Sequence, residues 1–158
     1  MSIWGGITGG LLGFVVLGPI GALVGSVIGS NLSSRSKRRK PNNFDQQVAF
    51  FAALFACLAK IAKADGRVDE AEIKKIEEII SIKLNLNKEH RHFAINIFQK
   101  AKDDNVSFEA YASNLYQVLS SSPNSLLVFY EMLFELALAD GILHPNEDSL
   151  LRKIPRIF

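Results

Sequence analysis

The sequence predicts an all-α protein in which an N-terminal transmembrane helix precedes a helical bundle with an internal two-fold repeat. Three observations carry this prediction: an uncharged apolar run from Ile3 to Leu32, helical apolar spacing in the remainder, and one short motif that occurs twice. We therefore divide the chain into a glycine-rich transmembrane anchor at 1–33, a basic juxtamembrane linker at 34–44 and a helical domain at 45–158.

The apolar run is long enough to cross a membrane, since about 20 apolar residues in a helix span a hydrocarbon core of roughly 30 Å. Five basic residues follow it directly and form a collar that we expect to lie against the membrane lipid: Arg35, Lys37, Arg38, Arg39 and Lys40. Because short flanking loops rich in Lys and Arg stay in the cytoplasm, we predict that the N-terminus lies outside and the C-terminal domain inside.

Two alternatives to a single span are weaker. A proline inside a helix removes a hydrogen bond, so Gly18-Pro19 predicts a kink, whereas a hairpin at this point would have arms of only about 12 to 15 residues. A cleaved secretory signal would carry its positive charge before the apolar run, where this chain has none. We therefore expect one kinked span.

The anchor carries glycines at steps of four residues, with Leu17 at the one position of the series that is not glycine: Gly5, Gly9, Gly13, Gly21, Gly25 and Gly29. This spacing places them on one stripe of a helix, where a second helix can approach closely in lipid. The stripe predicts a homodimer formed through the anchor. The simpler interpretation is that glycine is common in membrane helices.

Charge and cysteine content narrow the function further. Beyond the collar, 13 basic and 16 acidic residues leave a net charge of −3, so the basic balance of the whole chain belongs to the anchor and does not indicate nucleic-acid binding. The single cysteine, Cys57, excludes an internal disulfide framework and is expected to be a small buried apolar residue.

The domain carries only two glycines and no alternating strand pattern flanked by hairpin signals, which favours helices. Asn87 and Ser107 are suitable N-caps, and Pro123 marks a break. The spacing predicts helices at 45–63, 70–83, 88–102, 108–120, 125–139 and 146–157.

The predicted helices at 45–63 and 125–139 are apolar on almost all sides, which is typical of central, buried helices. The first of them is also a weak candidate for a second membrane span. Each leads into the same motif, Ala64-Asp65-Gly66 and, 75 positions later, Ala139-Asp140-Gly141. We predict two helix-corner-helix units that pack about a pseudo-twofold axis with their central helices in contact.

The corners gather carboxylates, which are suitable oxygen ligands for a hard cation such as calcium: Asp65, Asp69, Glu72, Asp140 and Glu147. Their spacing lacks the dense ligand series of an EF-hand loop. The alternative is helix punctuation, because Asp69 with Glu72 resembles a capping box and Pro145 suits a first helical position. A divalent cation is therefore the only cofactor that the sequence suggests.

Catalytic signals are sparse. His90 and His92 lie on what the pattern predicts to be an exposed helical turn, and no nucleophile, base and orienting group can be assembled from the spacing. We predict that the chain is not an enzyme.

Several segments together resemble the N-terminal part of the DjlA family of membrane-anchored DnaJ-like co-chaperones, including its tellurite-resistance TerB-like domain. They are Trp4-Gly5 at the start of the glycine-rich span, the basic collar, and the two corner motifs at 64–68 and 139–147. The resemblance implies a protein of the bacterial inner membrane with one span, a periplasmic N-terminus and a cytoplasmic TerB-like helical domain.

In that family a C-terminal J domain stimulates the ATPase of the Hsp70 chaperone DnaK. Such a domain needs a His-Pro-Asp turn, and His144-Pro145-Asn146 is not one because it ends in Asn and lies inside the second corner motif. We expect a DnaK-type Hsp70 partner only if a J domain follows in the full gene product. We leave open whether the chain is a truncated DjlA gene product, a fragment or a stand-alone relative.

These observations predict a membrane-tethered, non-enzymatic interaction and regulatory module of a DjlA-type co-chaperone without its J domain. The alternative of a different class is a metal-responsive, calcium-like stress sensor that binds the ion at its acidic corners. Asp65→Asn and Asp140→Asn variants separate the two, because only a sensor loses ion-dependent stabilisation.

Overall fold

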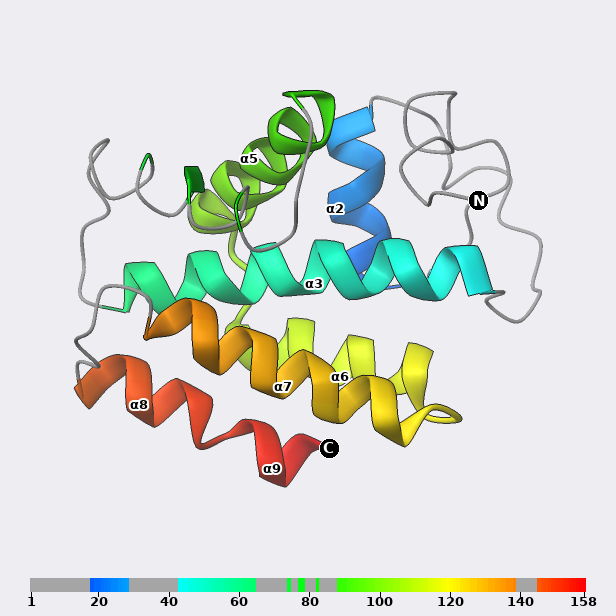
Figure 1. Cartoon of the computed structure of the whole chain (residues 1–158), viewed down its shortest axis with the longest axis vertical. Helices are drawn as coiled ribbons and strands as arrows, with labels where there is room; N and C mark the ends of the chain where they lie inside the picture. Colours follow the sequence, from blue (N-terminus) through cyan, green and yellow to red (C-terminus); the bar gives the residue numbers. More distant parts are fainter. Residues whose placement is uncertain are drawn as a thin grey trace.

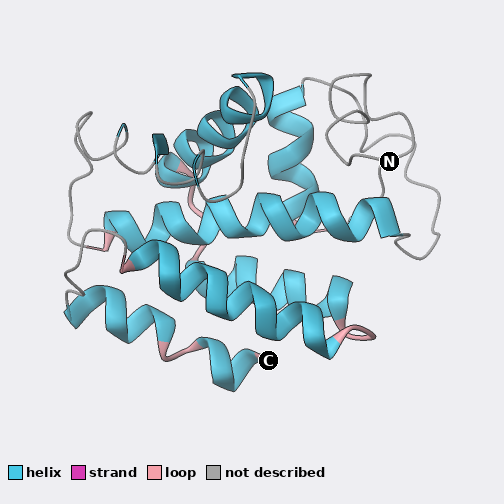
Figure 2. Cartoon of the chain, viewed as in Figure 1, coloured by secondary structure: helices cyan, strands magenta, loops and turns pink. Residues whose placement is uncertain are grey.

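The computed structural model describes residues 18–28, 43–64, 74, 77–78, 82, 88–138 and 145–158 of the chain, and these residues form helices joined by short turns (Figure 2). The helices are α2 (Pro19–Ile28), α3 (Asn43–Lys63), α5 (Lys88–Asp103), α6 (Phe108–Leu119), α7 (Pro123–Ala137), α8 (Pro145–Leu151) and α9 (Ile154–Ile157). The all-α prediction is confirmed.

Most predicted boundaries agree with the structure to within two residues. Ser107 is the N-cap of α6, and its hydroxyl accepts a hydrogen bond of 3.1 Å from the backbone N–H of Ala110, as predicted. Lys74, Glu77, Glu78 and Ile82 are helical, as a helix at 70–83 requires. The other predicted cap, Asn87, lies outside the described residues.

Two differences between the predicted and observed helices have the same reason, which is the placement of proline. Helix α7 begins at Pro123 and not at Ser125, because proline has no N–H to satisfy and fits the first turn. The helix predicted at 146–157 is divided into α8 and α9, and Pro155 lies in the first turn of α9. A continuous helix would need a backbone donor that Pro155 lacks.

Helix α3 lies at the centre of the fold. Figure 1 shows α2 and α5 on one side of it and α6 and α7 on the other, with α8 and α9 beyond α7, and α3 packs against α2, α5, α6, α7 and α8. Every residue from Ala52 to Ala59 is buried. The prediction that this helix is central is confirmed.

Helix α3 also has the length and composition of a membrane span. Within the described residues the window Gln46–Lys63 alone meets that description, and 61% of it is buried inside the protein. This burial is what a core helix requires, and the alternative of a second span therefore has little support.

The two central helices of the predicted repeat are in contact. Helices α3 and α7 run side by side in the same direction (Figure 1), and the rings of Phe50 and Phe129 meet edge to face at 5.5 Å. Just after the end of α3, the backbone carbonyl of Ala64 accepts a hydrogen bond of 3.2 Å from the side-chain amide of Asn146, in the first turn of α8. The predicted contact between the repeats is confirmed.

Candidate functional site

The second half of the predicted anchor packs on the helical body. Helix α2 contacts α3, α5 and α6 (Figure 1), and Ile20, Leu23 and Val24 of α2 are buried. Burying an aliphatic side chain of this size contributes about 1.5–3 kcal/mol. Ala22 and Ser26, on the opposite side of α2, are exposed. One face of α2 is therefore part of the hydrophobic core.

A buried side chain of α6 fixes the start of α2. Asn114 is only 6% exposed, and its Oδ1 accepts a hydrogen bond of 2.9 Å from the backbone N–H of Ile20. The first N–H groups of a helix have no partner within it, so Asn114 acts as an N-cap from a distant helix. This contact joins residues 94 positions apart in the sequence.

The residue before α2 has to be glycine. Gly18 has a φ of +90°, a conformation that L-residues with a side chain rarely adopt, and a Cβ at this position would lie 2.9 Å from the amide of Asn114. Its carbonyl accepts a hydrogen bond of 3.1 Å from the N–H of Ala22. Gly18-Pro19 was expected to kink one continuous helix, and in the structure α2 begins there.

Helix α2 alone is too short to cross a membrane. Ten helical residues are about 15 Å long, which is half of the hydrocarbon core. In the described structure its apolar face contacts α3, α5 and α6. The anchor therefore has two apolar environments available to its second half, the bilayer and the body.

A second polar cluster joins α3, the α5–α6 connection and α6. We call it the Asp104 cluster. Lys60 forms an ion pair of 2.7 Å with Asp104 Oδ1, and the same oxygen accepts a hydrogen bond of 3.0 Å from the N–H of Val106. The hydroxyl of Tyr111 donates a hydrogen bond to Asp104 Oδ2. The side chains of Lys60 and Asp104 are 12% and 26% exposed.

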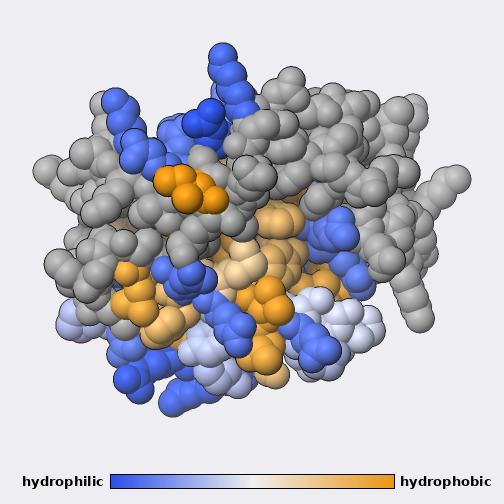
Figure 3. Space-filling view, viewed as in Figure 1, coloured by the Kyte–Doolittle hydropathy of each residue, from blue (hydrophilic) through white to orange (hydrophobic). Residues whose placement is uncertain are grey.

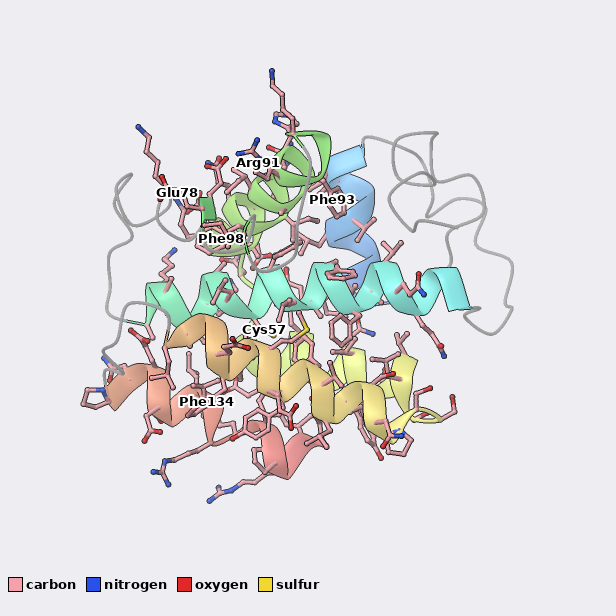
Figure 4. All side chains as sticks on the ribbon, in the orientation of Figure 1. Cys57, Glu78, Arg91, Phe93, Phe98 and Phe134 are labelled. Atoms are coloured by element: carbon pink, nitrogen blue, oxygen red, sulfur yellow. The ribbon has the colours of Figure 1, made fainter. Side chains whose placement is uncertain are left out.

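Cys57 and Tyr111 are both buried near this cluster, and Figure 4 shows Cys57 on α3. Burial, and less strongly the charge of Glu109, raises the pKa of the Cys57 thiol above its ordinary value. Burial, with the hydrogen bond to Asp104, raises the pKa of Tyr111. Cys57 therefore remains a neutral thiol, as predicted from the sequence, and not a reactive thiolate.

These raised pKa values predict a loss of stability at alkaline pH. The folded protein holds both protons more tightly than the unfolded chain, so this stability is complete below the unfolded pKa values and falls as the pH rises above about 9 to 10. We expect up to about 1.4 kcal/mol per pH unit for each group. Urea unfolding measured across this range tests it, and Tyr111→Phe should give a shallower slope above about pH 10.

Tyr116→Phe is the matched control, because Tyr116 lies on the same helix and is 40% exposed. It should leave the slope of stability against pH unchanged. Equal slopes for Tyr111→Phe and the unmodified chain would contradict the prediction.

The surface of α7 carries large apolar side chains. Leu127, Val128 and Phe134 are 56%, 46% and 39% exposed, and Glu131 and Glu135 are exposed beside them. Figure 3 shows apolar side chains among charged ones on the front of the molecule, where Figure 1 places α7, and Figure 4 labels Phe134 there. We call these five residues the α7 face.

The comparisons with known proteins agree with this architecture. Residues 51–158 match the family model described as tellurite resistance protein TerB. The chain belongs to the TerB family. The TerB region thus begins within α3 and includes the Asp104 cluster and the α7 face.

The segment before the TerB region matches a second family model. Residues 1–39 match the co-chaperone DjlA transmembrane domain, which covers the predicted anchor, α2 and most of the basic collar. This match supports a membrane-anchored protein and confirms the resemblance on which the sequence analysis relied.

Several curated relatives have the same two parts. The co-chaperone protein DjlA of Photobacterium profundum is 32% identical, with 98% of this chain and 60% of that protein covered. The DjlA of Coxiella burnetii is 32% identical, with 89% and 55% covered, and that of Escherichia coli K12 is 30% identical, with 96% and 57% covered. The chain therefore spans 55–60% of the length of these relatives. No solved structure matches the chain.

The predicted metal ligands of the TerB region remain largely untested. Asp65, Asp69, Glu72 and Asp140 lie outside the described residues. Glu147 lies in the first turn of α8 with 8% of its surface exposed, a position where a carboxylate stabilises a helix. Among the residues that the structure describes, no group of three or more His, Cys, Asp or Glu is placed to hold a metal.

The predicted membrane residues are described only in part. Gly21 and Gly25 lie on α2 and are half-buried, at the side of the face that packs on the TerB region. The other glycines of the stripe and the whole basic collar lie outside the described residues. The homodimer remains a prediction, whereas the surface interpretation of His92 is confirmed by its exposure.

Sequence reasoning missed Asn114, the Asp104 cluster and the α7 face. The sequence does carry a signal for Asn114, because this polar residue lies on the apolar stripe of α6, three residues after Tyr111 and four before Val118. The sequence carries no such signal for Asp104, since it directly follows Lys102 and Asp103 in a run of charged residues at the end of α5. The helix predicted at 125–139 was expected to be buried because it is apolar on almost all sides. That expectation was wrong for the α7 face, because Leu127, Val128 and Phe134 are exposed.

Proposed function

We propose that the chain is the membrane-tethered interaction and regulatory module of a DjlA-type co-chaperone. The observation that carries the proposal is the physical union of its two parts: α2, inside the match to the DjlA transmembrane domain, packs on the TerB region through its apolar face. The match of residues 1–39 to the DjlA transmembrane domain, before the TerB region, supports a body held at the membrane surface. The TerB family and the co-chaperone relatives suggest a non-enzymatic protein.

The proposed orientation places the N-terminus in the periplasm and the TerB region in the cytoplasm, at the bacterial inner membrane. The basic collar supports it, because Lys and Arg next to a span are retained on the cytoplasmic side and are attracted to anionic lipid. The glycine stripe supports a homodimer through the anchor.

Co-chaperone action with a DnaK-type Hsp70 belongs in this proposal to the longer protein. The chain spans little more than half of the DjlA relatives, so the TerB region and anchor would supply location and docking for that action. Within this function the TerB region selects or positions partners, and it performs no chemistry of its own.

The experiment is a topology and cross-linking assay on the full chain in a bacterial host with an intact DnaK system. We expect the chain in the alkali-resistant inner-membrane fraction. We expect its TerB region to be digested by protease in inverted vesicles and protected in intact spheroplasts. Digestion from the periplasmic side, or release by alkali, contradicts the proposal.

The same cells test self-association. Changing Gly9, Gly13, Gly21 and Gly25 to Leu should remove the cross-linked dimer, because bulky side chains keep two helices apart. Ala22→Leu with Ser26→Leu is the matched control, since both residues lie on the exposed side of α2. A dimer that survives the glycine changes contradicts this part.

A further inference from the structure

The outward side of α5 begins with basic residues. Lys88, Arg91 and His92 lie in its first two turns, and all three are exposed. We call these three residues the α5 basic face. Figure 3 shows hydrophilic side chains projecting from the molecule where Figure 1 places α5. The opposite side of the helix carries buried residues such as Ile97 and Phe98, so the α5 basic face is turned to solvent.

The charge of the α5 basic face is not neutralised within the described part of the chain. Lys88 and Arg91 form no ion pair there. Most other described cations do pair with a carboxylate, namely Lys60, Lys63, Lys102, Arg152 and Lys153. In the sequence, the segment 88–92 holds these two cations and two histidines against one acidic residue, Glu89. An anionic partner is therefore complementary to this end of α5.

The α5 basic face lies beside the part of the body that joins the anchor. Helix α5 packs against α2, and Figure 1 shows the C-terminal end of α2 and the N-terminal end of α5 at the same end of the molecule. Figure 4 labels Arg91 there, whereas the exposed Glu78 lies farther from α2. Residues 1–39, which include α2, match the DjlA transmembrane domain. The basic collar begins seven residues after Ile28, so two basic segments adjoin the same helix.

An anionic lipid surface fits this position better than a polyanion in solution does. Phosphate headgroups attract Lys and Arg near a membrane, and an anchored body meets them at high effective concentration. The chain beyond the collar carries a net charge of −3, so it does not attract a nucleic acid or an acidic protein from a distance. The tether removes the need for such long-range attraction, and a few local cations are then sufficient.

We propose that the α5 basic face binds anionic lipid headgroups and forms a second contact between the TerB region and the membrane, beside the anchor. Lys88 and Arg91 contact the phosphates, and His92 adds a hydrogen-bond donor. The contact turns α5 and α2 toward the bilayer and α8 and α9 away from it (Figure 1). This inference rests on the proposed function, because the anchor has to hold the body at the membrane.

The test uses the full chain in nanodiscs of neutral lipid, or of neutral lipid mixed with an anionic lipid, both with spin-labelled headgroups that quench fluorescence on contact. A fluorophore is attached through Gln99→Cys, because Gln99 is exposed seven residues after His92, on the same side of α5. Cys57 has no exposed surface and is not labelled. We expect stronger quenching in the anionic nanodiscs, and no difference at about 1 M salt, where the Debye length is about 3 Å.

A second label position shows whether the contact has a preferred side. Gln117 is exposed on α6, across α3 from α5 and α2 (Figure 1). A fluorophore attached through Gln117→Cys should be quenched equally in the two kinds of nanodisc. A rise in anionic lipid as large as that at Gln99→Cys would mean that the body approaches lipid without the proposed orientation, and it overturns the inference.

Charge variants identify the residues that make the contact. Lys88→Gln with Arg91→Gln should remove the difference between the lipids, because each cation near an anionic surface contributes about fivefold to binding, and two contribute about 30-fold. Lys88→Arg with Arg91→Lys keeps both charges and should keep the difference. Arg152→Gln with Arg156→Gln is the matched control, since both residues are exposed on the far side of α3. Unchanged melting of each variant confirms that the fold is retained.

Several results overturn the inference. They are equal quenching in the two lipids, a difference that survives Lys88→Gln with Arg91→Gln, and a difference that the far-side control also removes. Binding of duplex DNA or of a polyglutamate peptide to the chain in neutral nanodiscs, lost in the same variant while the lipid difference is absent, would assign the face to that polyanion. If the topology assay succeeds while the lipid difference is absent, the proposed function stands and only this contact is rejected.

Discussion

Asp104→Ala is expected to lower the free energy of unfolding by about 2–3 kcal/mol, because removing one partner of a partly buried ion pair leaves the other charge without compensation. The change leaves the ammonium of Lys60 only 12% exposed and removes the acceptor of the Tyr111 hydroxyl. It also frees the N–H of Val106. Three segments of the fold lose their common polar contact in one substitution.

Urea unfolding of the full chain in detergent, monitored by helical circular dichroism, measures this loss. Asp103→Ala is the matched control, because Asp103 is the neighbouring carboxylate, is 70% exposed and, with the residues that the structure describes, forms long ion pairs of 4.0 and 3.9 Å. We expect about 0.5 kcal/mol or less for the control. Similar losses for the two variants would show that the Asp104 cluster has no special role.

Asn114→Leu is expected to release α2 from the TerB region. The substitution removes the acceptor of the Ile20 N–H and leaves a buried donor unsatisfied, at a cost of about 1–3 kcal/mol. Hydrogen exchange in α2 should then be faster by roughly 5- to 150-fold, because exchange follows the local opening equilibrium. Mass spectrometry of the full chain in nanodiscs measures the rate.

Gln117→Leu is the control for this variant, because Gln117 is an exposed amide on the same helix. Its exchange in α2 should equal that of the unmodified chain. Gly18→Ala provides a second route to release, since its Cβ would lie 2.9 Å from the amide of Asn114. If hydrogen exchange in α2 is unchanged in both Asn114→Leu and Gly18→Ala, the contacts between Asn114 and the start of α2 do not hold this helix on the body.

A double variant separates the two possible costs of Gly18→Ala, which are backbone strain at Gly18 and crowding against Asn114. If crowding against Asn114 dominates, Gly18→Ala should be milder in an Asn114→Ala background, because the opposing amide is gone. If the positive φ of Gly18 dominates, the cost should be the same in both backgrounds. Either result measures how much the contact between Gly18 and Asn114 contributes to holding α2 on the body.

The sequence predicted the helical architecture well because its signals are local. Apolar spacing placed α3, α5 and α6, and the hydroxyl of Ser107 correctly predicted a cap. The boundaries that failed depended on Pro123 and Pro155, whose effect is also local, so closer attention to proline would have found them.

The membrane prediction shows where local reasoning ends. The uncharged run before the basic collar was sufficient to indicate an anchor, and the match to the DjlA transmembrane domain agrees. That α2 buries Ile20, Leu23 and Val24 in the body could not be predicted, because apolar residues enter lipid and a protein core for the same physical reason.

The sequence by itself therefore determined the helices, the anchor, the repeat and the membership in the TerB family. All of these depend on residues that are close in the sequence or on two motifs at a constant spacing. Only the tertiary structure decided that Asn114 caps α2, that Asp104 joins three segments, and that the α7 face is exposed while its repeat on α3 is covered. Each of these depends on which segments meet across a long separation in the chain. Burial and pairing are properties of that contact and not of the residues alone.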